Sequence, residues 1–101
     1  MIKHIVMWKL KEAAQAAHFK AQLDSCKNLV PGMLAFEVAI RTEALEANCD
    51  VVLYSVFVDK AALAAYQNHP QHQQISGGLG ALRDTRVVLD YEIYEISGDP
   101  T

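Results

Sequence analysis

Four stretches of the chain carry the pattern of β-strands. Side chains of different character alternate over residues 2–10, 33–41 and 86–96, and β-branched and aromatic residues dominate 51–58. Successive side chains of a strand point to opposite faces of a sheet, so a period of two residues is typical of a strand. We therefore predict four strands over these ranges, with the second and third antiparallel to each other.

Two segments carry helical signals instead. Apolar residues recur every three or four positions between Glu12 and Val30, which is the spacing of one face of an amphipathic helix. Asp59 is placed to cap a second helix over residues 60–66, because its carboxylate can accept from free N–H groups of the first turn. Pro70 disfavours helical geometry at the preceding residue and favours a helix start at its own position. We predict a break there and a short helix after it.

The order of these elements, strand, helix, strand, strand, helix, strand, indicates the α+β class. It suits a ferredoxin-like βαββαβ protomer, in which a four-stranded antiparallel sheet carries both helices on one face. A chain of 101 residues is long enough for one core. We expect a single domain over residues 1–101, with a short polar tail from about residue 97.

Several strands place apolar side chains on both faces of the predicted sheet. In the first strand, Ile5 and Met7 point away from Val6 and Trp8. Helices cover only one of these faces, so the other would expose an apolar patch too large for a soluble monomer. We therefore predict a homodimer in which two copies stack sheet on sheet.

Composition narrows the classes of partner and compartment. The formal net charge is −3, which gives no electrostatic reason to expect nucleic acid. The chain opens on a strand-like run without a signal peptide or a membrane-spanning apolar stretch, so we expect a cytoplasmic protein with no membrane partner. Cys26 and Cys49 are isolated in sequence and are expected to be reduced thiols. No nucleotide-binding fingerprint is present, and we expect no cofactor.

The segment Tyr66-Gln67-Asn68-His69-Pro70-Gln71-His72 holds a phenol and two imidazoles within seven residues. His69 precedes the proline, so we expect its ring to bond backbone groups where one helix ends and the next begins. A metal site at His69 and His72 is the minority interpretation, because no acidic or cysteine partner lies at a diagnostic spacing. An imidazole beside a carboxylate can remove a proton, and a phenol can donate to a carbonyl oxygen that gains charge. Tyr66, His72 and Asp90 supply those groups.

Five motifs, taken together, resemble the stress-responsive dimeric α/β barrel proteins, or Dabb domains. The resemblance runs from Lys3 to Tyr91. The motifs are Lys3-His4-Ile5-Val6, Leu29-Val30-Pro31-Gly32, the strand over 50–57, Tyr66-x-x-His69-Pro70-x-His72 and Leu89-Asp90-Tyr91. The resemblance implies a ferredoxin-like protomer that pairs through its sheet into a barrel, in agreement with the dimer predicted above.

The family includes plant stress proteins, bacterial members of unassigned role and a plant polyketide cyclase, and only the cyclase has a chemistry to carry over. The resemblance implies that Tyr66 and His72 act at a pocket and that Asp90 orients His72. The residues expected to line this pocket and bind substrate are His4, Val6, Trp8, Phe19 and Leu23. Leu23 stands where the cyclase has a tyrosine, and Trp8 adds bulk, so the pocket should be narrower and the substrate different.

These groups suggest acid–base chemistry of the cyclase or isomerase kind, with His72 as the base and Tyr66 as donor to a substrate carbonyl. The hypothesis requires the His72 ring to lie within hydrogen-bond reach of Asp90. The first alternative is a non-catalytic stress-response or ligand-binding homodimer, in which Tyr66 is a core residue and Asp90 pairs with Arg83 or Arg86. A cofactor-free monooxygenase is a further alternative.

Overall fold

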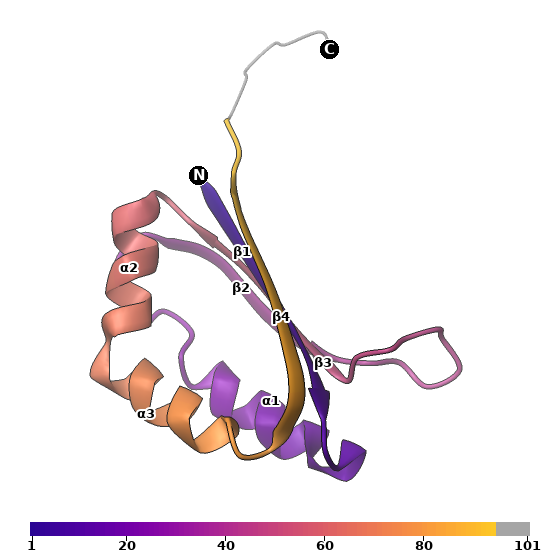
Figure 1. The fold of residues 1–101 in the computed structure, drawn as a ribbon. Coiled ribbons are helices and arrows are strands. Elements are labelled where there is room, and N and C mark those ends of the chain that lie inside the picture. The colour runs from indigo at the N-terminus through magenta and orange to yellow at the C-terminus, as the bar shows by residue number, and fades with distance from the viewer. Residues whose placement is uncertain (95–101) are drawn as a thin grey trace, which may run out of the picture.

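The computed structural model describes residues 1–94, and Figure 1 shows how its helices and strands are arranged. The elements are β1 (Ile2–Leu10), a 3₁₀ turn η1 (Ala13–Gln15), α1 (Ala16–Asp24), β2 (Met33–Ile40), β3 (Val51–Phe57), α2 (Lys60–Asn68), α3 (Pro70–Leu79) and β4 (Arg83–Glu92). All four predicted strands are present. The predicted end of the last strand at residues 95 and 96, and the polar tail, lie outside the described residues.

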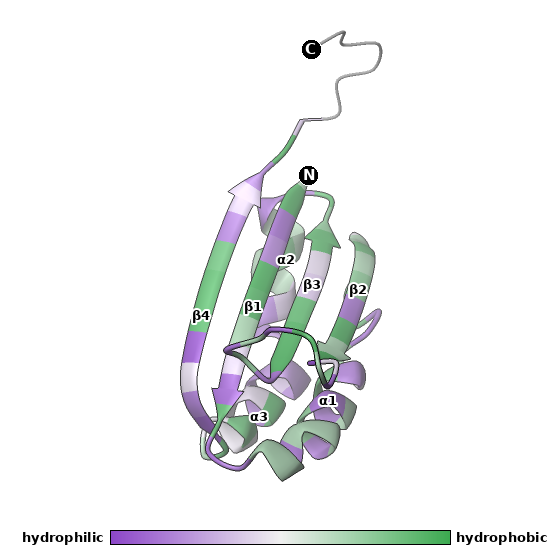
Figure 2. Ribbon diagram, turned by 90° about the vertical axis from the view of Figure 1, so that its right-hand side faces the viewer, coloured by the Kyte–Doolittle hydropathy of each residue, from purple (hydrophilic) through white to green (hydrophobic). Residues whose placement is uncertain are grey.

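The sheet has the strand order β2-β3-β1-β4, and every neighbouring pair is antiparallel. All three α-helices lie on one face of it (Figures 1 and 2). The predicted α+β, ferredoxin-like class is therefore confirmed. β1 lies inside the sheet between β3 and β4, while β4 forms one edge, so side chains near that edge have less cover from the helices.

Two groups of buried side chains fill the space between the sheet and the helices. In the first, the rings of Trp8 and Phe19 meet at 5.1 Å between centroids and join β1 to α1. In the second, the rings of Phe57 and Tyr66 meet at 5.2 Å and join β3 to α2. Aromatic side chains bury more apolar surface than most others, so these two pairs fix the helices on the sheet.

The first helix is shorter than predicted. The expected range of 12–30 is divided into the turn η1 and the helix α1, which ends at Asp24. The next backbone bond, from the N–H of Cys26 to the carbonyl of Leu23 (2.9 Å), spans three residues, as in a 3₁₀ turn. Asn28 then has a φ of 59°, and an α-helix of L-residues does not continue through that left-handed conformation. Cys26 lies in a turn but is buried. Its position in the sequence therefore continued the helical spacing of apolar residues beyond the actual end of α1.

The corner between α2 and α3 forms as predicted. Asp59 caps α2 by accepting a hydrogen bond from the N–H of Ala62 at 2.8 Å. His69 ends α2 in an extended conformation, and its Nδ1 accepts from the N–H of Gln71 at 3.1 Å. Pro70 is the first residue of α3. The expected capping role of His69 is therefore confirmed, and the corner turns the chain so that α3 runs over the sheet beside α1 (Figure 1).

β4 begins earlier than predicted and contains a bulge. Thr85 pairs with Lys9, but the next pair in the ladder joins Arg83 to Leu10. Asp84 is therefore an extra residue on β4 with no counterpart on β1. A β-bulge changes the direction of the side chains beyond it, so this irregularity decides which residues of β4 face the helices.

The face of the sheet opposite the helices is left uncovered by them, and the loop between β2 and β3 projects from one end of it (Figures 1 and 2). The large exposed side chains of this face are Met7, Val87, Leu89 and Tyr91. Met7 pairs directly with Val87 across β1 and β4, and Leu89 is 63% exposed. This surface is the two-faced pattern that the sequence predicted.

Both cysteines are free thiols, with Cys26 buried and Cys49 half-buried. None of the helices within residues 1–94 is long and apolar enough to span a bilayer. In the same part of the chain, no three His, Cys, Asp or Glu side chains gather where they could hold a metal ion.

Candidate functional site between α3 and the sheet

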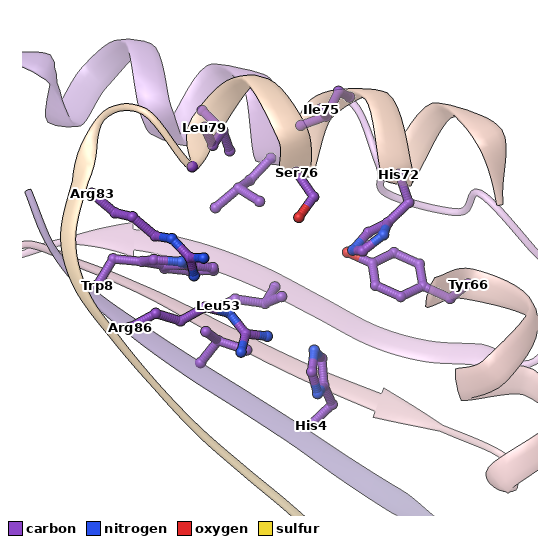
Figure 3. Close-up of a pocket in the computed structure, with 13 residues that line it drawn as sticks. His4, Trp8, Leu53, Tyr66, His72, Ile75, Ser76, Leu79, Arg83 and Arg86 are labelled. Atoms are coloured by element: carbon purple, nitrogen blue, oxygen red, sulfur yellow. The ribbon is translucent and has the colours of Figure 1, made fainter. Parts of the chain in front are cut away.

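A cavity of about 50 Å³ lies between α3 and the ends of β1 and β4 (Figure 3). Its lining consists of His4, Val6, Trp8, Leu23, Leu53, Tyr66, His72, Ile75, Ser76, Leu79, Gly80, Arg83 and Arg86. Pockets for drug-sized ligands measure about 300–1,000 Å³. The cavity is therefore suited to a ligand of few heavy atoms, which agrees with the narrow pocket expected from Leu23 and Trp8.

Tyr66 presents its hydroxyl to this cavity from α2. The side chain is fully buried, and its ring lies 6.3 Å from that of Phe36 as well as packing on Phe57. The hydroxyl oxygen is buried and has no hydrogen-bond partner among the described residues. Burial raises the pKa of the phenol well above its ordinary value of 10.0, so Tyr66 remains a hydrogen-bond donor throughout the neutral range.

His72 reaches the cavity from the first turn of α3. Its ring centroid lies 4.5 Å from that of Tyr66, with the ring planes inclined at 56° (Figure 3). Its Nδ1 is also buried and forms no hydrogen bond of regular geometry within residues 1–94, although the backbone carbonyl of Gln67 lies near enough to the ring to oppose part of the effect of burial. Burial lowers the pKa of the imidazole below 6.5, so the ring is neutral at pH 7. The two rings that carry these polar atoms thus pack against each other at one end of the cavity.

Asp90 pairs with His4 and not with His72. The Oδ1 of Asp90 contacts the Nδ1 of His4. The two residues are direct partners in the β1–β4 ladder, so their side chains project from the same face of the sheet, whereas His72 lies on a helix above it. The predicted orientation of His72 by Asp90 is therefore wrong, and the histidine–aspartate pair of this site is His4–Asp90.

Asp90 is only partly buried. Its side chain is 38% exposed, whereas that of His4 is 3% exposed. β4 is the edge strand, so the carboxylate of Asp90 remains partly in water, whereas the imidazole of His4 is enclosed. The His4 ring lies 6.4 Å from that of Tyr66, and Figure 3 shows it projecting from β1 toward Tyr66 and His72.

Arg83 and Arg86 lie at the other end of the cavity. Both line it, and Figure 3 shows both side chains extending from β4 toward Trp8. Neither forms a salt bridge with a carboxylate within residues 1–94. The alternative in which Asp90 pairs with one of these arginines is therefore not observed, because the carboxylate contacts His4.

Most of the residues expected at the pocket are brought together there. Val6 and Trp8 line the cavity with His4, on the face that the parity of the first strand gives them, and Leu23 lines it from α1. Phe19 does not line the cavity, because it packs behind Trp8 in the core. The lining residues that sequence reasoning did not include are Leu53, Ile75, Ser76, Leu79, Gly80, Arg83 and Arg86.

The lining residues that sequence reasoning missed differ in how strongly the sequence indicates their position at the cavity. Ile75 and Leu79 follow His72 at helical spacing, so their shared face with it was a usable signal. Arg86 pairs with Trp8 across β1 and β4, which requires the register between two distant strands. Arg83 depends on the bulge in β4 and had no local signal.

The chain matches the Dabb family, described as the Stress responsive A/B Barrel Domain, over residues 2–93. No curated protein matches it. A dimeric ferredoxin-like protein of unknown function from Jannaschia sp. CCS1 is 29% identical, with a TM-score of 0.75 over 91% of this chain and 98% of that one.

Two further structures share the architecture. A dimeric protein of unknown function and ferredoxin-like fold from Bacteroides fragilis NCTC 9343 has a TM-score of 0.76 and 24% identity, covering 91% of this chain and 95% of that one. The hydroxynitrile lyase from Passiflora edulis has a TM-score of 0.76 and 20% identity, covering 94% of each chain. At these identities the likeness shows the fold alone. The family match, which spans nearly the whole chain, shows that this protein belongs to the Dabb family of stress responsive A/B barrel domains.

Proposed function

We propose that the cavity binds a small carbonyl compound and catalyses proton transfer at the carbon next to the carbonyl, the step that cyclases and isomerases share. The observation that carries this proposal is the pair of buried, unpartnered polar atoms at one end of the cavity, Tyr66 Oη and His72 Nδ1. A buried polar atom without a hydrogen bond costs about 1–3 kcal/mol. A ligand oxygen that bonds to these groups would remove that cost.

Tyr66 is the donor to the substrate oxygen. Its phenol stays protonated at neutral pH, and a donor held in an enclosed site stabilises the negative charge that a carbonyl oxygen gains during enolisation. The neutral His72 lies against the phenol and, in the tautomer with its proton on Nδ1, donates a second hydrogen bond to the same oxygen.

His4 is the base, and this assignment replaces the one expected for His72. Asp90 holds the Nδ1 of His4, which leaves the Nε2 lone pair for the cavity when the shared proton is on Nδ1. The proton leaves the substrate carbon for Nε2, and the electron pair moves onto the oxygen held by Tyr66. Asp90 positions the ring and stabilises the imidazolium that forms.

The competing function is binding without turnover, as in a non-catalytic stress-response or ligand-binding protein. It is favoured by the small volume of the cavity, about 50 Å³, and by the close packing of Tyr66 against Phe36 and Phe57. Both functions need a ligand at the same atoms, so only a measurement of turnover separates them.

Exchange of the α-protons of butanone in D₂O, followed by ¹H NMR, tests the proposal. The wild-type protein should accelerate exchange, and Tyr66→Phe and His4→Gln should each reduce the acceleration by the roughly 10²–10⁴-fold typical of a lost acid–base group. His18→Gln is the matched control, because His18 is exposed on α1. Butanone that binds but exchanges no faster than in buffer would contradict catalysis and support the non-catalytic function.

We also infer that two copies pair through the uncovered face of the sheet. That face carries an apolar groove lined by Ile5, Met7, Val87, Val88 and Leu89. The structurally similar proteins from Jannaschia and Bacteroides are described as dimeric. The candidate site lies on the helix side of the sheet, away from the faces that would pair.

A further inference from the structure

The bulge in β4 brings two arginines onto one face of the sheet. Arg83 and Arg86 are three residues apart, and in a regular strand side chains at that spacing point to opposite faces. The extra residue Asp84 restores the same parity, so Arg83 is opposite Leu10 and Arg86 is opposite Trp8. Leu10 and Trp8 are both buried on the helix side. Bulges are common next to active sites, where they re-aim a side chain.

The two guanidinium groups have no negative charge to balance them inside the site. The cavity lining contains two arginines, two histidines and no Asp or Glu. Within residues 1–94 neither arginine has a carboxylate partner, and the first carboxylate further along β4 on their own face, that of Asp90, contacts His4. Arg83 is half-buried and Arg86 is exposed, so both charges are partly in water, and in a chain whose formal net charge is −3 they mark a locally positive site at which an anionic ligand would pair with them.

The space between the arginines and the polar pair is apolar. Val6, Trp8, Leu53 and Leu79 line it. A strongly hydrated inorganic anion gains nothing from such a lining, whereas an organic anion with a short hydrocarbon body can bury that body there. The planar fork of an arginine matches the two oxygens of a carboxylate.

We propose that Arg83 and Arg86 form a carboxylate-binding subsite and that the substrate class of this protein is a small oxo acid. Its carboxylate lies at Arg83 and Arg86, its carbonyl oxygen lies at Tyr66 and His72, and a few carbon atoms bridge the two ends along Trp8. The carbonyl half of this assignment rests on the function proposed above. The carboxylate half rests on the arginine pair, which has no carboxylate partner within the described chain.

Isothermal titration with 4-oxopentanoate and with 4-oxopentanamide tests the subsite, because the two probes differ only in charge and carboxylate oxygens. The wild-type protein should bind the acid at least tenfold more tightly than the amide. The double variant Arg83→Gln/Arg86→Gln should weaken binding of the acid by about tenfold or more, as expected for lost hydrogen bonds to a charged group, and leave the amide unchanged. Arg41→Gln, at an exposed position just beyond β2, is the matched control and should change neither affinity.

Further binding measurements distinguish this inference from the proposed catalysis. Tyr66→Phe should retain the preference for acid over amide, since it alters only the carbonyl end. Inorganic phosphate at the concentration of the acid should not displace it. Equal affinity for acid and amide, no binding of either, an unchanged double variant, or displacement by phosphate would each overturn the subsite as stated. Because butanone carries no carboxylate, its exchange reports on catalysis whatever the outcome here.

Discussion

The Oδ1 of Asp90 contacts the Nδ1 of His4 across the β1–β4 ladder, joining residues 86 positions apart in the sequence. The contact holds one ring nitrogen of a buried histidine and leaves the other toward the cavity that Tyr66 and His72 also line. The site thus has an oriented imidazole, that of His4, on the sheet and a neutral one, that of His72, on the helix above it. The site therefore contains two histidines in different electrostatic environments.

Replacing Asp90 with Asn should separate positioning from folding. An amide at this position no longer selects the His4 tautomer with its proton on Nδ1, so butanone exchange should fall by about 10²-fold or more. The melting temperature should change little, because the carboxylate is 38% exposed and partly exposed ion pairs contribute about 0–1 kcal/mol. Asp24→Asn removes an exposed carboxylate that pairs with Lys20 and should leave exchange intact. An Asp90→Asn protein with wild-type exchange would contradict the positioning role.

Part of this site could be predicted from the sequence because its signals are local. The cap at Asp59, the break at Pro70 and the capping ring of His69 depend on neighbouring residues, and the parity of β1 places His4 and Trp8 on one face. All of these features are present in the structure.

The errors concern relations between distant segments. The partner of Asp90 depends on the register of β4 against β1, which no local pattern specifies. Phe19 shares a helix face with Leu23 but lies one turn earlier along α1, where its ring packs against Trp8 and stays out of the cavity. Arg83 faces the helices only because of the bulge. Strand register, the position of a helix along the sheet and bulges are decided by packing of the whole domain.

The free energy of unfolding should decrease as the pH is lowered, because of a contribution from His72. Its pKa is lowered in the folded state by burial, so below the unfolded value of 6.5 the unfolded chain binds a proton that the folded chain does not. The stabilisation by the neutral ring is therefore fully present above pH 6.5 and is progressively lost as pH falls toward the folded pKa. Urea unfolding of His72→Gln should show a shallower loss of stability from pH 7 to pH 5 than the wild type. His18→Gln should follow the wild-type curve, and a His72→Gln curve of wild-type slope would count against the buried neutral ring.

Shortening Leu79 should enlarge the cavity at a cost in stability. Leu79 is buried and lines the cavity from α3, and a buried Leu→Ala change costs about 2–5 kcal/mol. Leu79→Ala should also admit acetophenone, which is larger than butanone, as measured by ligand-induced chemical shifts. Leu63→Ala removes an equally large side chain from the other core group and should destabilise the protein without admitting acetophenone. Binding of acetophenone by neither variant, or by Leu63→Ala alone, would contradict the predicted enlargement of the cavity at Leu79.

A charge on the uncovered sheet face should prevent dimer formation. Leu89 is 63% exposed and lines the apolar groove of that face, so Leu89→Lys would bury an unpaired ammonium between two copies. Sedimentation velocity at micromolar concentration should show a dimer for the wild type and a monomer for this variant. Ala64→Lys places the same charge at an exposed position on α2 and should remain dimeric. A monomeric wild type would contradict pairing through this face.

A crystal structure of the protein soaked with 4-oxopentanoate tests the central claim most directly. The account predicts electron density in the cavity between α3 and the sheet, with the carbonyl oxygen within hydrogen-bond distance of Tyr66 Oη and the carboxylate at Arg83 and Arg86. An empty cavity at a saturating concentration of the acid, or a ligand bound with its carbonyl away from Tyr66 and His72, would contradict it.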